Sequence, residues 1–180
     1  MNIPNSITIA RILLVPLTIW LLISSAYDAA FLVFVAAGVS DGVDGYIARR
    51  MKTQSVLGAY LDPLADKALL VSNYATLGMI KAIPAWLVLL VITRDVLIVG
   101  GVMLAWLLDR PLLIKPLLLS KANTVVQISY VGIVLGVLAL SWEAAVPLQL
   151  AALVVALTTI LSGAQYLYAW VKHMNMETNT

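Results

Sequence analysis

The sequence predicts an all-α integral membrane protein with six transmembrane helices and both termini in the cytoplasm. Hydrophobic residues make up 62% of the 180 residues, and charged residues make up only 11%. A soluble domain carries about 25% charged residues, so this composition could not cover a surface that faces water. The net charge of +2 is too small to indicate nucleic-acid binding, and the absence of cysteine excludes a thiolate metal site.

Six apolar stretches are each long enough to cross a bilayer, which takes about 20 residues. We expect the helices at residues 7–25, 29–49, 57–80, 85–108, 120–141 and 146–171. Proline residues occur near several of the expected breaks, and Pro16 lies inside the first stretch, where neighbouring helices can tolerate a kink. The chain is expected to form one membrane domain over residues 1–180.

Lysine and arginine are unevenly distributed between the expected loops. Arg50 and Lys52 lie between the second and third stretches, and Arg110 and Lys115 lie between the fourth and fifth, whereas the opposite side carries only Lys81. Because cytoplasmic loops are enriched in these residues, both termini are predicted to be cytoplasmic. The same rule places the polar helix ends on the cytoplasmic side. We expect a multi-pass protein of the inner or plasma membrane.

Four aspartates in the second and third stretches are unusual, because an Asp at the centre of a membrane helix costs about 2.5–3.5 kcal/mol on insertion scales. At 100° per residue, Asp41 and Asp44 share one helix face, and Asp62 and Asp66 share a face of the next helix. If these faces meet, they form an oxygen-rich site that suits Mg²⁺ or Mn²⁺. Four carboxylates accommodate two such ions better than one.

Small residues accompany the carboxylates, and they leave room for a nucleotide or a phosphate: Gly42, Gly45, Ala48 and Gly58. Arg49 could hold a phosphate through two parallel hydrogen bonds. The structural alternative is that the small residues only pack helices, with the carboxylates paired to Arg49, Lys67 and Arg94.

The pattern Asp41-x2-Asp44-Gly45-x2-Ala48-Arg49-x8-Gly58-x3-Asp62-x3-Asp66 resembles the signature of the CDP-alcohol phosphatidyltransferases at every fixed position. The resemblance implies that Asp41, Asp44 and Asp62 bind metal. It implies two roles for Asp66, as a metal ligand and as the catalytic general base. Metal would hold the pKa of that carboxyl low, which fits the ligand role better than the base role.

The same resemblance implies a donor pocket for CDP-diacylglycerol. Gly45, Ala48 and Gly58 would line the cytidine diphosphate site, and Arg49 would contact its phosphates. An acceptor hydroxyl would attack the phosphorus that carries diacylglycerol, and CMP would leave. Positioning and electrostatic stabilisation supply most of the catalysis in such a transfer.

The residues expected to bind the acceptor resemble two different groups within the family. Residues 2–11, the length and the six spans resemble those of phosphatidylglycerophosphate synthases. Glycerol 3-phosphate is therefore the expected acceptor, with its phosphate held by Arg94, Lys121 and Arg110. Two strings differ, since Asp95 follows Arg94 where that group has glutamate, and Asn123 replaces a lysine. Both strings resemble CMP-forming cardiolipin synthases, whose acceptor, phosphatidylglycerol, is the alternative. Arg94 and Asp95 need not pair, because adjacent helix positions do not face each other.

Two alternatives come from other functional classes. Intramembrane carboxylates also mark ion pathways, so a metal-ion transporter is one, although the sequence shows no inverted repeat. A non-catalytic assembly subunit is the other.

Gly132 and Gly136 form a GxxxG pattern, which we expect to pack helices within the chain, with a homodimer as the alternative. Five tryptophans near the expected helix ends are predicted to be interfacial anchors: Trp20, Trp86, Trp106, Trp142 and Trp170.

Overall fold

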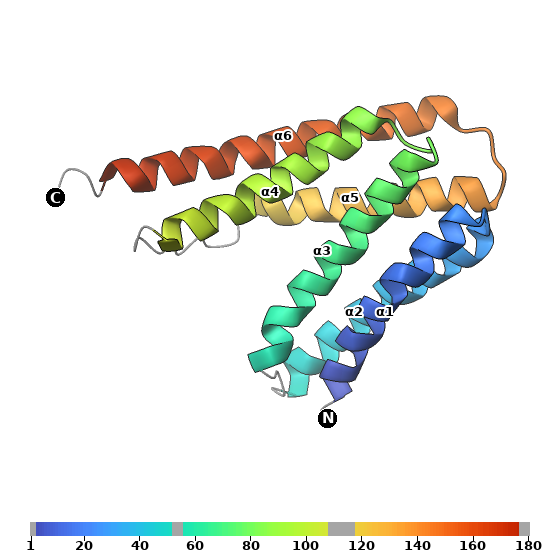
Figure 1. Cartoon of the computed structure of the whole chain (residues 1–180), viewed down its shortest axis with the longest axis horizontal. Helices are drawn as coiled ribbons and strands as arrows, with labels where there is room; N and C mark the ends of the chain where they lie inside the picture. The colour runs from blue at the N-terminus through green and yellow to red at the C-terminus, as the bar shows by residue number, and fades with distance from the viewer. Residues whose placement is uncertain (1–2, 52–55, 108–117, 177–180) are drawn as a thin grey trace. The chain divides into compact units, whose positions relative to one another are not determined.

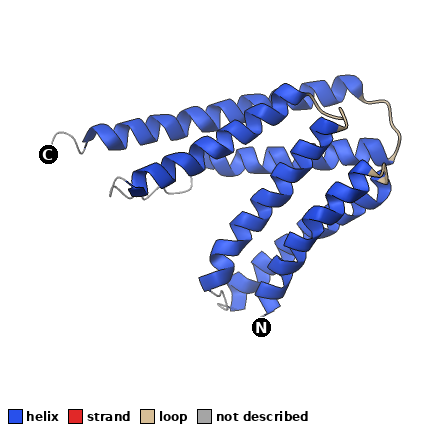
Figure 2. Cartoon of the chain, viewed as in Figure 1, coloured by secondary structure: helices blue, strands red, loops and turns tan. Residues whose placement is uncertain are grey.

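The computed structural model describes the backbone of residues 3–51, 56–107 and 118–176, and the side chains of residues 12–40, 67–101, 103, 104, 107 and 118–172. Within these ranges all regular secondary structure is α-helical (Figure 2). The helices are α1 (Ile3–Ile23), α2 (Tyr27–Met51), α3 (Val56–Met79), α4 (Ala85–Leu107), α5 (Leu118–Ala139) and α6 (Ala145–Met176).

The six predicted helices are confirmed, and their bounds agree with the sequence to within a few residues. The largest differences are at the two ends of the chain, where α1 begins at Ile3 and α6 continues to Met176. The first helix continues through Pro16. Among the described residues, Leu118–Ala139 and Ala145–Lys172 are long and apolar enough to cross a membrane, and Ile12–Ile23 and Tyr27–Ser40 are shorter apolar segments.

The same turn ends α1, α3 and α5. Ser25, Lys81 and Ser141 each adopt a left-handed backbone, with φ between 48° and 60°. After α1, the Ala26 amide donates to the Leu21 carbonyl (2.9 Å) and the Ser25 amide donates to the Leu22 carbonyl (3.1 Å). This pair of bonds is the Schellman motif, which satisfies carbonyls that the helix end leaves free. The motif lets each of these helices reverse direction within a few residues.

The chain divides into two compact units, and the first consists of residues 1–83 and 131–144. Inside this unit α1 packs against both α2 and α3 (Figure 1). Leu22 on α1 and Tyr74 and Leu77 on α3 are among its fully buried side chains. Because α1 contacts both of its neighbours, it fixes the directions of the two helices that carry the aspartates.

The GxxxG pattern of α5 packs against α2 within the first unit. A Cβ atom placed on Gly132 would lie 3.7 Å from the Phe34 ring, and one placed on Gly136 would lie 3.5 Å from the Phe31 ring. The two glycines therefore receive aromatic side chains of the same chain. This confirms the expectation of intrachain packing for the pattern.

The second unit, residues 84–130 and 145–180, contains α4 packed against α6. Along α6, Val155, Thr159 and Ser162 are buried, whereas Leu153, Leu157 and Ile160 are more than half exposed. On this part of α6 the polar side chains of Thr159 and Ser162 thus face inward, whereas Leu153, Leu157 and Ile160 face outward, as expected for a helix surrounded by lipid. Trp86 and Trp142 are exposed as interfacial anchors would be, but Trp170 is half-buried.

We expect Ser25→Gly to raise the free energy of unfolding by about 1 kcal/mol, because a left-handed backbone is strained for every residue except glycine. The hydrogen bond from the Tyr27 hydroxyl to Ser25 that is lost is exposed and 3.4 Å long, so it offsets little. Thermal unfolding in detergent measures the change. Ser24→Gly, one residue earlier and without positive φ, is the matched control and should not stabilise. Equal effects of the two substitutions would contradict the strain argument.

Candidate functional site

The predicted donor and metal residues lie on α2 and α3, toward the ends that residues 52–55 connect. Their side chains, in the interval 41–66, are outside the described ones: Asp41, Asp44, Gly45, Ala48, Arg49, Gly58, Asp62 and Asp66. The helix bounds alone relate their positions. Only residues 52–55 separate α2 from α3, so Met51 and Val56 lie at most about 18 Å apart.

The four aspartates occur at matched heights along these two helices. With a rise of 1.5 Å per residue, Asp44 and Asp62 lie about 10 Å from the helix ends that the connection joins, and Asp41 and Asp66 lie about 15 Å from them. Each aspartate of α2 thus has a counterpart on α3 at a similar height. This register would let two helices bring their carboxylates to one place, with no slip of one helix along the other.

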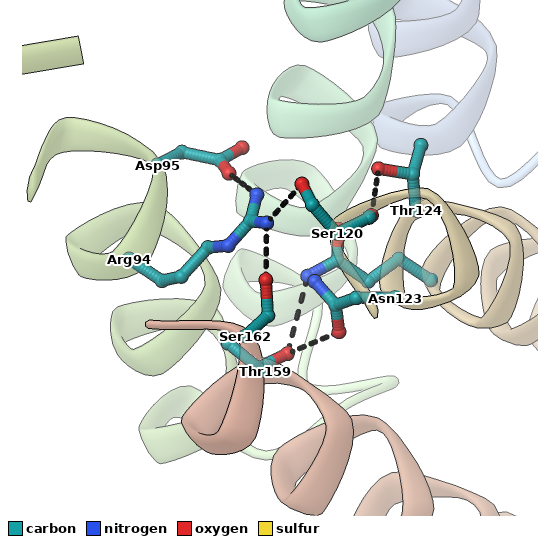
Figure 3. Close-up of polar contacts among 8 residues, drawn as sticks. Arg94, Asp95, Ser120, Asn123, Thr124, Thr159 and Ser162 are labelled. Carbon is teal, nitrogen blue, oxygen red and sulfur yellow. Dashed lines mark hydrogen bonds and ion pairs between the residues drawn. The ribbon is translucent and has the colours of Figure 1, made fainter. Parts of the chain in front are cut away.

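The acceptor-side candidate Arg94 is at the centre of a described polar cluster (Figure 3). Its side chain is only 4% exposed, although arginine is seldom buried. One terminal nitrogen, Nη2, donates to the Ser120 hydroxyl of α5 (2.7 Å) and to the Ser162 hydroxyl of α6 (2.6 Å). The guanidinium therefore ties α4, α5 and α6 together inside the second unit.

Arg94 also pairs with its neighbour in sequence, contrary to the expectation that adjacent helix positions need not meet. Nη1 of Arg94 donates to Oδ1 of Asp95 at 2.7 Å, and both side chains are buried. Adjacent residues of a helix point in different directions, but a long arginine side chain can bend back toward an adjacent carboxylate. The pair offsets the charge of Arg94 in a place where an isolated cation would be strongly disfavoured.

A second chain of hydrogen bonds joins α5 to α6 beside this cluster. The Thr159 hydroxyl donates to Oδ1 of Asn123 (3.1 Å), and Nε2 of Gln127 donates to the same hydroxyl (3.2 Å). Asn123 is completely buried. The residue that replaces a lysine in the sequence comparison therefore joins two helices through its carbonyl oxygen. Figure 3 shows Asn123 and Thr159 directly beside the Arg94 cluster.

Two buried nitrogens in these clusters have no hydrogen-bond partner in the described part of the chain. They are Nε of Arg94 and Nδ2 of Asn123. Buried donors in native proteins are nearly always satisfied, so each marks a position where a bound group could accept a hydrogen bond. The other acceptor-side candidates differ, since Lys121 is exposed at the start of α5 and Arg110 lies outside the described residues.

The family model for CDP-alcohol phosphatidyltransferase matches residues 1–172. The chain belongs to the CDP-alcohol phosphatidyltransferase family. The match covers both structural units and includes all four aspartates as well as Arg94.

Similar members of the family carry two different names. The chain is 33% identical to human cardiolipin synthase (CMP-forming) over 92% of its own length and 60% of that protein. It is 35% identical to the fission yeast cardiolipin synthase (CMP-forming) / mitochondrial hydrolase fusion protein, covering 92% of this chain and 30% of that protein. It is 36% identical to the rice chloroplastic CDP-diacylglycerol–glycerol-3-phosphate 3-phosphatidyltransferase 1, covering 73% and 45%. The chain therefore spans less than two thirds of the length of these relatives.

Sequence reasoning missed most of the partners of Arg94 in this phosphatidyltransferase chain. Ser162 and Thr159 were not singled out, because isolated hydroxyl residues in an apolar helix commonly bond to their own backbone. One available signal was their spacing, since Thr159 and Ser162 are three residues apart and so share the face of α6 that buries Val155. Ser120 was likewise not singled out.

We expect Arg94→Met to destabilise the protein by about 3–5 kcal/mol, because it breaks the buried ion pair between Arg94 and Asp95. The free energy of unfolding in detergent, from denaturant titration, measures the loss. Lys121→Met removes a cation of the same charge from an exposed position and should change stability by no more than about 0.5 kcal/mol. A loss of similar size in both variants would mean that the buried pair does not stabilise the fold.

Proposed function

We propose that this phosphatidyltransferase moves a phosphatidyl group from CDP-diacylglycerol to a glycerol-containing phosphate acceptor and releases CMP. The observation that carries the proposal is the complete run of signature residues from Asp41 to Asp66, inside a chain that matches the family model over residues 1–172. The names of the relatives support the same reaction class.

The donor set on α2 and α3 fits a divalent cation. It consists of carboxylates at matched heights, which are hard oxygen ligands of the kind that Mg²⁺ and Mn²⁺ prefer. We propose that Asp41, Asp44, Asp62 and Asp66 hold the metal, with two ions favoured over one. The bound metal would neutralise phosphate oxygens while negative charge moves toward CMP.

The remaining donor residues bind and orient the nucleotide in this proposal. Gly45, Ala48 and Gly58 leave space along the two helices, and Arg49 holds a phosphate of the cytidine diphosphate. Asp66 takes the proton of the acceptor hydroxyl. The hydroxyl oxygen then forms a bond to the phosphorus that carries diacylglycerol, and the bond from that phosphorus to the oxygen of CMP breaks.

Phosphatidylglycerol is the acceptor that the described residues favour, and glycerol 3-phosphate is the second candidate. Asn123 accepts a hydrogen bond from Thr159, and Asp95 offsets the charge of Arg94. A site with a single partly compensated arginine suits a phosphodiester with one negative charge better than a dianionic monoester. Glycerol 3-phosphate remains a candidate because a rice relative with that specificity in its name is 36% identical.

We propose that all six helices span the membrane, with both termini in the cytoplasm and the carboxylates facing that side. The outward apolar face of α6 and the two long apolar helices support a membrane location. The inner or plasma membrane is the proposed site, and residues 1–180 act as one domain. A homodimer is part of the same proposal, although the GxxxG pattern does not supply its interface.

We expect Asp66→Asn to lower CMP release from CDP-diacylglycerol by about a hundredfold or more, because it removes a metal ligand and the general base together. Chelation with EDTA should abolish release, and Mg²⁺ or Mn²⁺ should restore it. Asp28→Asn is the control, since Asp28 is exposed in the first turn of the same helix that carries Asp41. Full activity of Asp66→Asn would exclude this site from catalysis.

An acceptor panel should identify the second substrate. With CDP-diacylglycerol and metal present, we expect phosphatidylglycerol to support faster CMP release than glycerol 3-phosphate, since Asp95 offsets the charge of Arg94. Mass spectrometry of the lipid product distinguishes cardiolipin from phosphatidylglycerophosphate. A phosphatidylglycerophosphate product alone would establish glycerol 3-phosphate as the acceptor.

A further inference from the structure

An apolar groove of about 360 Å³ runs between α4 and α6 in the second unit. We call it the α4–α6 groove, and it is lined by residues of α4 between Val96 and Leu104 and by residues of α6 between Gly163 and Trp170. Its volume falls within the range of about 300–1,000 Å³ that is usual for small-molecule sites. The lining side chains are apolar or aromatic, so the groove suits a hydrocarbon occupant.

Arg94 lies against one end of this groove. A Cβ atom on Gly163, which lines the groove, would be 3.6 Å from Cγ of Arg94. The central guanidinium carbon of Arg94 is also 5.8 Å from the ring centre of Tyr166, another lining residue. An arginine over an aromatic face is a favourable arrangement. The groove is therefore apolar along its length and has a cation at one end.

The groove continues away from Arg94 along two parallel helices. Gly163 lies at the level of Arg94, and a Cβ atom on Gly101 would lie 3.8 Å from the Trp170 ring. Seven residues separate the two levels on both helices, which corresponds to about 10 Å. A Cβ atom on Gly100, which also lines the groove, would meet nothing within 4 Å. Adjacent glycines on α4 thus keep the groove open.

We propose that the α4–α6 groove binds an acyl chain of the acceptor phospholipid, whose phosphodiester contacts Arg94. The inference rests on the proposed function and extends it by giving the acceptor a site for its hydrocarbon. Nε of Arg94 is buried and has no hydrogen-bond partner in the described part of the chain, so it is available to a phosphate oxygen. Because Asp95 offsets the charge of Arg94, the site suits a lipid phosphate with one negative charge better than a dianion.

The acceptor is a better occupant than the donor because of where the cation lies. The donor's phosphates are assigned to Arg49 on α2, whereas the groove ends at Arg94 on α4. A soluble acceptor such as glycerol 3-phosphate has no group that could use the apolar length of the groove. A phospholipid acceptor uses both the charged end and the apolar length.

The test fills the groove and measures each substrate separately. The substitutions Gly100→Phe and Gly101→Leu place a large side chain in the open space, and we expect each to raise the KM for dioleoyl phosphatidylglycerol by about tenfold or more. The KM for CDP-diacylglycerol should stay within about twofold of the unaltered chain. Val99→Phe is the matched control, since Val99 is adjacent on α4, 54% exposed and outside the groove lining.

Acyl-chain length supplies a readout that a purely structural role would not change. The unaltered chain should have a much lower KM for dioleoyl than for dihexanoyl phosphatidylglycerol, and Gly100→Phe should remove most of that difference. A phosphatidylglycerol with a diazirine at the end of its acyl chain should label residues 96–104 or 163–170 upon irradiation, without need of turnover. The label should be lost in Gly100→Phe.

Four outcomes would overturn the inference while leaving the proposed function intact. They are an unchanged KM for phosphatidylglycerol in the filled variants, a KM increase for CDP-diacylglycerol instead, a lower melting temperature without any KM change, and use of glycerol 3-phosphate alone. The second outcome would assign the groove to the donor, and the third to a structural lipid. Absence of CMP release with every acceptor would overturn the proposed function and this inference together.

Discussion

The second unit must compensate the charge and the hydrogen-bond donors of the buried guanidinium of Arg94. A cation that is 4% exposed in an apolar helix is tolerated only when its charge and its donors are compensated. Asp95 supplies the opposite charge, and hydroxyl groups of Ser120 and Ser162 supply acceptors from two other helices. Removing any of these partners would leave a polar atom buried without its partner, so Arg94 links the packing of α4, α5 and α6.

The same constraint explains why the outer and inner faces of the second unit differ. Lipid solvates leucine and valine well, so Leu153, Leu157 and Ile160 can face outward without penalty. Polar groups have no such solvent and must find partners inside, as Thr159 does with Asn123 and Gln127. A membrane bundle arranged in this way keeps its polar side chains together, and a polar substrate headgroup can then enter a region that already accommodates charge.

The helices and the family could be predicted from the sequence, because both depend on local pattern. Apolar length and helix-breaking residues located all six helices, and the fixed spacing from Asp41 to Asp66 identified the family that the model match confirms. The left-handed turns at Ser25, Lys81 and Ser141 could not be predicted, because none of these positions is a glycine. Their geometry follows from hydrogen bonds at helix ends, which serine and lysine do not reveal.

The partners of Arg94 could not be predicted, because they depend on contacts between residues far apart in the chain. Ser162 follows Arg94 by 68 positions, and only the packing of α4 on α6 brings them together. Helix periodicity left the pairing with Asp95 open, since periodicity locates Cβ atoms and says little about where a long side chain ends. The donor half of the site remains a prediction from the sequence, because the side chains from Asp41 to Asp66 lie outside the described ones.

The replacement of lysine by Asn123 connects the packing of the bundle to the choice of acceptor. A lysine at this buried position would add a second cation beside Arg94 and would need a further carboxylate or a bound anion to compensate it. Because the attraction to a cation grows with the charge of the anion, the added cation would favour a dianionic acceptor over a singly charged phosphodiester. Asparagine instead satisfies its oxygen with Thr159 and leaves one nitrogen without a partner in the described part of the chain. A neutral amide that donates one hydrogen bond, next to an arginine already paired with Asp95, makes a site with less positive charge, which favours a lipid phosphodiester over a dianion.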